Sequence, residues 1–267
     1  MVAVRFLVAA AVMLPVAVRG IPLGRLGVWR SIAIPILSGA AFSLLNTGGL
    51  DYAPAAHAAA LTAPLGGVCT GLAAHFVLRE RLSRRSALGF AVITAGAVGV
   101  VASSVVGQAG NARMLIGHLH FLSAAMCWAG YVVIARRSGL SALQLTAMSV
   151  IGSALIFSLP YLWLAGERIR AAPWGELLVQ GTLHGLLAAV LSVVLFNIAI
   201  ARLGAARSGA ATALAPVLGA VFALVFLGDT PAVAEWAAYA TVAAGVWLAA
   251  SRGRQAPAVV APPTPPR

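Results

Sequence analysis

The chain has 267 residues, of which 61% are hydrophobic and 9% are charged. Soluble domains carry roughly 25% charged residues, so this composition excludes a soluble globular protein and predicts an integral membrane protein. The formal net charge of +12 comes from 18 arginines and no lysine. These arginines lie between apolar runs, which favours membrane-flanking anchors over a nucleic-acid surface, and we expect the lipid bilayer to be the partner instead.

Nine apolar runs approach or exceed the roughly 20 residues with which a helix crosses a bilayer. The sequence therefore predicts an all-α bundle of nine membrane helices. The first run contains Arg5, whose long side chain we expect to snorkel to the interface. Residues 1–20 could alternatively be a secretory signal peptide, although they lack a clean cleavage site. The runs cover residues 3–18, 31–50, 53–78, 86–106, 116–135, 142–164, 176–200, 204–227 and 231–250.

The arginines divide unequally between the two sides of such a bundle. One set of loops holds 14 arginines and the alternate set holds four. Because cytoplasmic loops are enriched in arginine, the richer side and the C-terminus are predicted to be cytoplasmic. The four are Arg5, Arg113, Arg168 and Arg170.

The chain contains an internal repeat. Pairs of equivalent Pro, Gly and carboxylate positions recur at offsets of 152 and then 149 residues. The helices predicted at 53–78 and 204–227 belong to different copies and cross in opposite directions, so the copies are inverted. Inverted repeats form a site near the bilayer midplane and support alternating access. The pairs are Pro64 with Pro216, Gly67 with Gly219, Glu80 with Asp229 and Gly96 with Gly245.

The two copies differ in their number of helices. The first repeat, residues 1–106, has four, and the second, residues 116–250, has five. Nothing in the first copy matches the helix predicted at 116–135, so we expect the first helix of a five-plus-five design to be missing, by truncation or by a misplaced start. The Pro-rich residues 251–267 are predicted to be a disordered cytoplasmic tail.

Several side chains inside the predicted spans could bind a solute, because polar groups are costly in lipid. Asn46 and Asn197, which lie at approximately equivalent positions, could contact a polar solute or join helices. Pro64 and Pro216 each free a backbone carbonyl in mid-helix, which suits a cavity wall or a packing kink. Thr212 shares a helix face with Pro216 and either lines a pocket or packs on a neighbour.

The aromatic and titratable candidates are equally open to two interpretations. Trp128 and Tyr131 lie one turn apart in mid-helix and form either a pocket wall or bundle packing. His57, near one end of its helix, could titrate and couple transport to protons, or could be structural. His118 and His120 are two residues apart, so their rings diverge and we expect both at the interface. Glu80 is predicted to form ion pairs at the basic turn between two helices, as part of a gate.

The ordered set of motifs resembles the drug/metabolite transporter superfamily, in particular EamA-type permeases. The resemblance rests on a mid-helix proline followed by residues 78–83 (LRERLS), on Arg5-Phe6 opening a run that ends at Leu14-Pro15, and on Trp128 and Tyr131 before an arginine pair. The resemblance implies ten helices, cytoplasmic termini and transport of small metabolites. We therefore expect a multi-pass protein of the bacterial cytoplasmic (inner) membrane.

These observations favour a permease that moves a small metabolite, such as an amino acid, an amine or a drug-like solute, with export as the expected direction. Catalytic motifs such as HExxH and GxSxG are absent from the sequence, so an enzyme is disfavoured, and we expect neither a metal nor a cofactor. A non-transporting truncated membrane protein and, less favoured, a channel remain alternatives. Association into a homodimer is left open.

Overall fold

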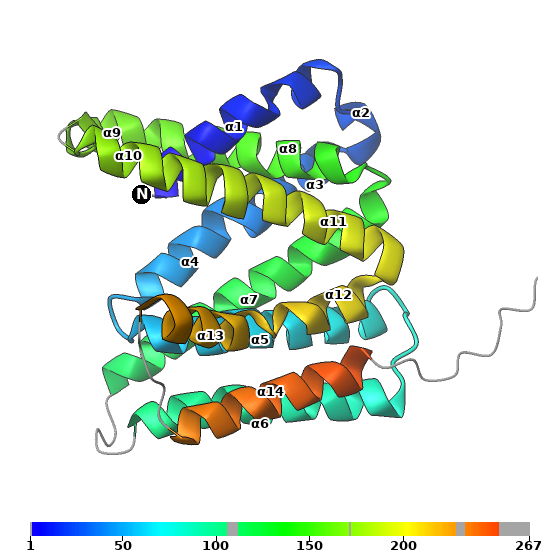
Figure 1. Cartoon of the computed structure of the whole chain (residues 1–267). Helices are drawn as coiled ribbons and strands as arrows, with labels where there is room; N and C mark the ends of the chain where they lie inside the picture. The colour runs from blue at the N-terminus through cyan, green and yellow to red at the C-terminus, as the bar shows by residue number, and fades with distance from the viewer. Residues whose placement is uncertain (1, 106–111, 171, 228–232, 251–267) are drawn as a thin grey trace, which may run out of the picture.

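The computed structural model describes residues 2–105, 112–170, 172–227 and 233–250, which are built from helices (Figure 1). Within these residues, each of the nine apolar runs of the sequence is mainly helical. Asp229, the expected mate of Glu80, and the tail at 251–267 lie outside the described residues. The helices are α1 Val2–Val18, α2 Leu23–Leu26, α3 Val28–Pro35, η1 Ile36–Ala40, α4 Ala41–Gly49, α5 Ala55–Phe76, α6 Arg84–Val105, α7 Ala112–Ser138, α8 Ala142–Ser153, η2 Ala154–Ser158, α9 Leu159–Arg170, α10 Trp174–Gln180, η3 Gly181–Leu191, α11 Ser192–Leu203, α12 Ala205–Thr212, α13 Ala215–Leu227 and α14 Val233–Ala250.

Six of the described helical spans are long and apolar enough to cross a membrane, and two shorter apolar helices join them. Three of the long spans are interrupted by π-helical turns, η1, η2 and η3, without leaving the helical path. Such wider turns often occur at functional sites. The outward surface of the long spans is apolar, because large side chains such as Trp163 (86% exposed) and Phe226 (76% exposed) face away from the bundle.

Local chemistry explains where several spans begin and end. Ser141 and Gln144 form a reciprocal capping box at the start of α8, which satisfies two backbone N–H groups that the first helical turn cannot. Pro54 and Pro173 precede α5 and α10, where a missing N–H costs nothing. Gly204 separates α11 from α12 with φ +88°, a conformation that glycine adopts without strain.

Equivalent helices of the two copies pack directly on one another. α1 contacts α8, α5 contacts α12, and α6 contacts α14, as Figure 1 shows for the last pair at the bottom of the view. A pseudo-two-fold axis between inverted halves brings equivalent elements together in this way. The fold is therefore an inverted-repeat membrane bundle.

Glycines allow two of these contacts to be very close. A Cβ atom added at Gly67 of α5 would overlap the carbonyl of Gly209 in α12. A Cβ added at Gly89 of α6 would lie 2.5 Å from the Ala249 nitrogen and 2.6 Å from the Gly245 oxygen of α14. Small residues at such crossings let backbones approach and gain van der Waals contact, which drives helix association in lipid.

The two repeat prolines have different surroundings. α5 is continuous through the buried Pro64. The second span is interrupted by a turn at residues 213–214, and α13 begins only at Ala215, directly before Pro216. The expected symmetry of the two prolines therefore extends to their positions in the sequence but not to the geometry of their helices.

We expect Gly89→Ala to lower the melting temperature in detergent, because the added methyl group meets backbone atoms of α14 that cannot move independently. Overpacking of this kind costs about 1–3 kcal/mol. Gly99→Ala on the same helix is the matched control. Its Cβ would meet only the Ala238 side chain at 3.6 Å, an ordinary contact. Equal melting temperatures for the two variants would contradict the close-packed α6–α14 interface.

Candidate functional site

A cavity of about 830 Å³ lies between the two halves of the bundle. Its walls come from both copies, including η1 and α4 from the first and η3, α11, α12 and α13 from the second. The span formed by α10, η3 and α11 and the span formed by α12 and α13 diverge from their shared turn (Figure 1) and supply facing walls. Hydroxyl and amide side chains interrupt a largely apolar lining. They are Ser38, Asn46, Thr62, Ser149, Ser192, Thr212 and Tyr239.

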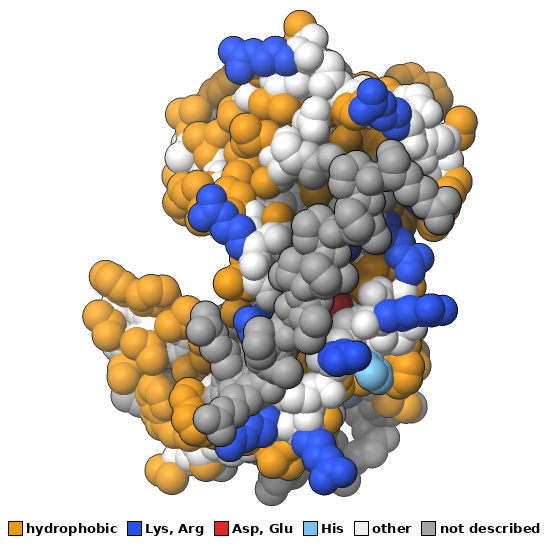
Figure 2. Space-filling model, turned by 90° about the vertical axis from the view of Figure 1, so that its right-hand side faces the viewer, with side chains coloured by type: hydrophobic (Ala, Val, Ile, Leu, Met, Phe, Trp, Pro, Cys, Tyr) orange, Lys and Arg blue, Asp and Glu red, His pale blue; other side chains and the backbone are white. Residues whose placement is uncertain are grey.

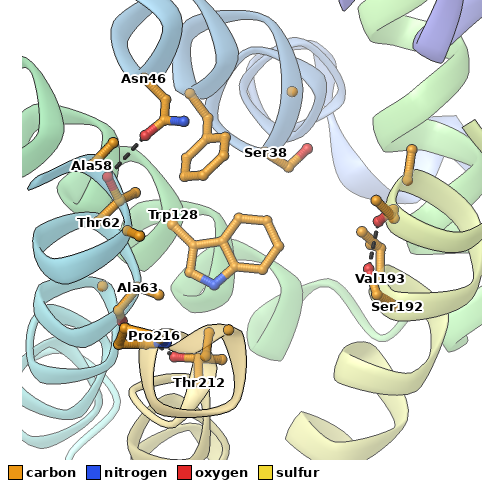
Figure 3. A pocket seen from close by; sticks show the side chains of 18 of the residues that line it. Ser38, Asn46, Ala58, Thr62, Ala63, Trp128, Ser192, Val193, Thr212 and Pro216 are labelled. Atoms are coloured by element: carbon orange, nitrogen blue, oxygen red, sulfur yellow. Dashed lines mark hydrogen bonds between the residues drawn. The ribbon is translucent and has the colours of Figure 1, made fainter. Parts of the chain in front are cut away.

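Asn46 and Thr62 form a polar pair on one wall (Figure 3). Thr62 Oγ1 on α5 donates a hydrogen bond of 2.8 Å to Asn46 Oδ1 on α4. This bond leaves the Asn46 amide group with its two N–H donors at the cavity. On another wall, Thr212 Oγ1 donates to the Gly209 carbonyl at 2.7 Å, so the hydroxyl oxygen keeps its capacity to accept.

Trp128 projects from α7 between these walls (Figure 3) and is the centre of an aromatic cluster. Its ring centroid lies 5.6 Å from that of Phe42, 5.3 Å from that of Tyr131 and 5.2 Å from that of Phe196. The rings are tilted, as aromatic pairs prefer. Phe42 and Trp128 line the cavity, whereas Tyr131 is fully buried behind Trp128.

A buried hydrogen-bond chain lies behind the aromatic cluster. Tyr131 Oη donates to Asn197 Oδ1 at 2.7 Å, and Asn197 Nδ2 donates to Thr146 Oγ1 at 3.2 Å. Asn197 is 2% exposed and Tyr131 and Thr146 are 0% exposed. The chain joins α7, α11 and α8, so Asn197 connects helices of the second copy and does not face the cavity.

Most described arginines lie at one end of the bundle, which we call the arginine-rich end. Figure 2 looks onto this end, where arginine side chains are spread over the face. The end includes the loops at 19–30, 79–85, 136–141 and 202–207. The opposite end holds His57, His118 and Arg113, and we call it the histidine end.

Glu80 joins three elements at the arginine-rich end. Its carboxylate accepts the backbone N–H groups of Ala205 and Ala206, at 3.3 and 3.4 Å, at the start of α12. The N-terminus of a helix carries partial positive charge and favours an anion. Arg136 Nη2 of α7 lies 3.5 Å from the same carboxylate. The ion-pair partner is therefore on α7, and not in the basic turn that flanks Glu80 in sequence.

At the histidine end, His57 of α5 is 1% exposed and its Nδ1 lies 3.0 Å from His118 Nε2 of α7. His118 is half-buried and contacts α5. The sequence had predicted a position at the membrane interface. His120 turns to a different neighbour, with its ring 5.6 Å from that of Tyr52, as the divergence of rings two residues apart predicts.

The structure divides the residues that the sequence singled out. Asn46, Trp128, Thr212 and Pro216 line the cavity. The others lie outside the lining. These are Pro64 and Tyr131, which are buried in packing, Asn197 in the hydrogen-bond chain, and His57 at the histidine end.

Sequence reasoning missed several lining residues. Arg5 faces the cavity, so the expectation that it snorkels to the interface is wrong. Thr62 and Ser192 are ordinary small polar residues in apolar runs, and no local signal marks them. The motif Arg5-Phe6 resembles a family pattern in sequence, but the direction of the Arg5 side chain depends on how α1 is rotated against η1 and α4.

We expect Tyr131→Phe to destabilise the protein by about 1–3 kcal/mol, because it leaves the buried Asn197 Oδ1 without a donor. The melting temperature in detergent measures this effect. Tyr161→Phe is the matched control, since Tyr161 is only half-buried and its ring stacks on Phe157 at 5.9 Å. If the melting temperature of Tyr131→Phe equals that of the wild type, this hydrogen bond contributes little to stability.

Comparisons with known proteins agree with this architecture. A solved crystal structure aligns with 93% of this chain and 85% of its own, at a TM-score of 0.74 and 22% sequence identity. Such a likeness establishes the fold alone. No curated protein sequence matches the chain. The model of the EamA-like transporter family matches residues 1–102 and again residues 115–251. This double match covers nearly all of the chain, which therefore belongs to the EamA-like transporter family.

Proposed function

We propose that the protein is a permease that moves a small metabolite across the bacterial cytoplasmic membrane by alternating access. One observation carries the proposal: the cavity between the inverted halves is lined by both copies of the repeat. Such a site is reachable from alternate sides when the halves rock against one another. The volume of about 830 Å³ suits a small organic solute.

The contacts around the cavity support a state closed at one end. The Glu80 contacts with Arg136 and α12, and the buried Tyr131–Asn197 pair, lie between the cavity and the arginine-rich end. We infer that this end, with the C-terminus, is cytoplasmic, because cytoplasmic loops are rich in arginine. The proposed direction is export. The solute enters after the Glu80 contacts break, and it leaves through the histidine end.

Substrate binding is assigned to Asn46, Trp128, Thr212 and Pro216, with Thr62 as the partner that orients Asn46. Tyr131, Asn197 and Pro64 support the walls from behind. His57 pairs with His118 away from the cavity, so its proposed role is at the outer end and not in substrate contact. The four-helix first repeat, residues 1–106, and the five-helix second repeat, residues 116–250, are the two units that we propose rock against each other.

Flux tests the function directly. Purified protein in proteoliposomes is expected to exchange labelled solutes from a panel of amino acids and drug-like compounds, and Trp128→Ala is expected to reduce the rate at least about tenfold, a loss of roughly 1.4 kcal/mol. Trp163→Ala, which removes a lipid-facing tryptophan that is 86% exposed, is the matched control. Ionic current without saturable flux would instead indicate a channel, and neither would indicate a non-transporting protein.

Access to the cavity tests the role of Glu80. In a variant lacking Cys69 and Cys127, a reporter Ser192→Cys in the lining is exposed to a membrane-impermeant maleimide added at either end. Glu80→Ala is expected to increase labelling from the arginine-rich end several-fold, because α12 loses its carboxylate cap and α7 its ion pair. Glu176→Ala removes an exposed carboxylate elsewhere and serves as the control. Unchanged labelling would mean that Glu80 does not hold this end closed.

A further inference from the structure

Arg5 carries a positive charge into the cavity wall. It lies in the first turns of α1, and its guanidinium donates a hydrogen bond to Ser43 Oγ on α4. The guanidinium carbon lies 4.6 Å from the centroid of the Phe6 ring, a cation–π arrangement. The Nε atom is buried and has no hydrogen-bond partner. The Arg5 guanidinium therefore contacts the Ser43 hydroxyl and the face of the Phe6 ring, and the Arg5 side chain also lines the cavity.

No carboxylate of the described residues neutralises this charge. Among the described residues that line the cavity, Arg5 is charged and the others are uncharged. The ion pair found in the described part of the chain joins Arg136 and Glu80 at the arginine-rich end. Asp51 and Glu176, which are near span ends, are exposed. An arginine held in a low-dielectric wall without a counter-ion is costly, so such a residue commonly marks a ligand pathway.

The chemistry of guanidinium specifies the missing partner. Its planar N–H groups match a carboxylate in a bidentate arrangement, and such charge-assisted hydrogen bonds are roughly twice as strong as neutral ones. A cationic solute in the same cavity would be repelled by Arg5. The neutral donors and acceptors of Asn46 and Thr212 place no charge requirement on the rest of the solute.

The remaining walls are suited to an apolar body. Phe42 and Trp128 present tilted rings with centroids 5.6 Å apart. The same cavity is also lined by small apolar residues, including Ala59, Ala189 and Ala220. Burying an aromatic or aliphatic group against these walls gains roughly 25 cal/mol for each Å² of apolar surface removed from water.

We propose that the solute is an amphipathic organic anion whose carboxylate pairs with Arg5 and whose apolar or aromatic body lies against Phe42 and Trp128. This proposal rests on the proposed permease function and narrows its substrate class. Of the solutes expected from the sequence, acidic drug-like compounds fit the charge and simple amines do not. An amino acid offers the carboxylate, but its ammonium group meets no carboxylate among the described residues that line the cavity.

Three probes that share one body and differ in charge test the proposal: phenylacetate, phenylacetamide and phenethylamine. In the wild-type protein, phenylacetate is expected to raise the melting temperature at concentrations roughly 10- to 100-fold below those that phenylacetamide requires, since a hydrogen bond to a charged group is worth about that factor. Phenethylamine is expected to give no shift. This comparison needs no variant, so it does not depend on the folding of a mutant.

The variants then assign the preference to one residue. Arg5→Gln is expected to abolish the preference for phenylacetate over phenylacetamide. Arg5→Lys keeps the positive charge but lacks the planar pair of N–H donors of the guanidinium, so it is expected to retain a weaker preference for phenylacetate over phenylacetamide. Arg19→Gln, at an exposed residue directly after the far end of the same helix, is the matched control and should behave as the wild type. A preference for phenylacetate that survives in Arg5→Gln would overturn the assignment.

Other outcomes separate this inference from the proposed function. If phenylacetamide or phenethylamine stabilises the wild type as well as phenylacetate does, or if none of the three gives a shift, the anionic substrate class is wrong. Flux of any other solute in proteoliposomes would still support a permease. If no solute of any charge is moved, the proposed function fails as well, whatever the probes show.

Discussion

The two copies of the repeat are joined where glycine backbones touch. In hydrocarbon there is no hydrophobic force between helices, so association depends on close van der Waals contact and on interhelical hydrogen bonds. Gly67 meets Gly209 where α5 crosses α12, and Gly89 meets Gly245 where α6 crosses α14. Because these contacts occupy one side of the bundle, α5 and α12 can hold one wall of the cavity in place while other helices diverge from it.

The polar contacts are distributed differently from the glycine contacts. The Glu80 carboxylate and Arg136 are in contact at the arginine-rich end, and the Tyr131–Asn197 pair is buried behind the aromatic cluster. The Glu80 contacts are partly exposed, and water can replace them at modest cost. The glycine crossings have no such substitute. The structure thus combines close-packed apolar contacts between the halves with partly exposed polar contacts at the arginine-rich end.

The helical bundle was predictable because bilayer thickness imposes a minimum apolar length that can be read from the local sequence. The cavity-facing positions of Asn46, Trp128 and Thr212 were among the alternatives considered, since polar and aromatic residues in mid-span stand out. The direction of Arg5 was not predictable, because it depends on the rotation of α1 against helices that are distant in sequence. The His57–His118 pair joins residues 61 positions apart, and nothing near either residue indicates its partner.

The turn at residues 213–214 makes the two halves mechanically unequal. On one side of it, α12 contacts the Glu80 carboxylate at its first residues and packs closely on Gly67 of α5. α13 begins on the other side, and its 13 residues form a rod about 20 Å long at 1.5 Å per residue. A rotation of roughly 10° about this turn would carry the far end of α13 through about 3 Å. α5 has no such interruption. The two equivalent spans beside the cavity therefore differ, because one is a single continuous helix and the other consists of two helices, α12 and α13, joined by a turn.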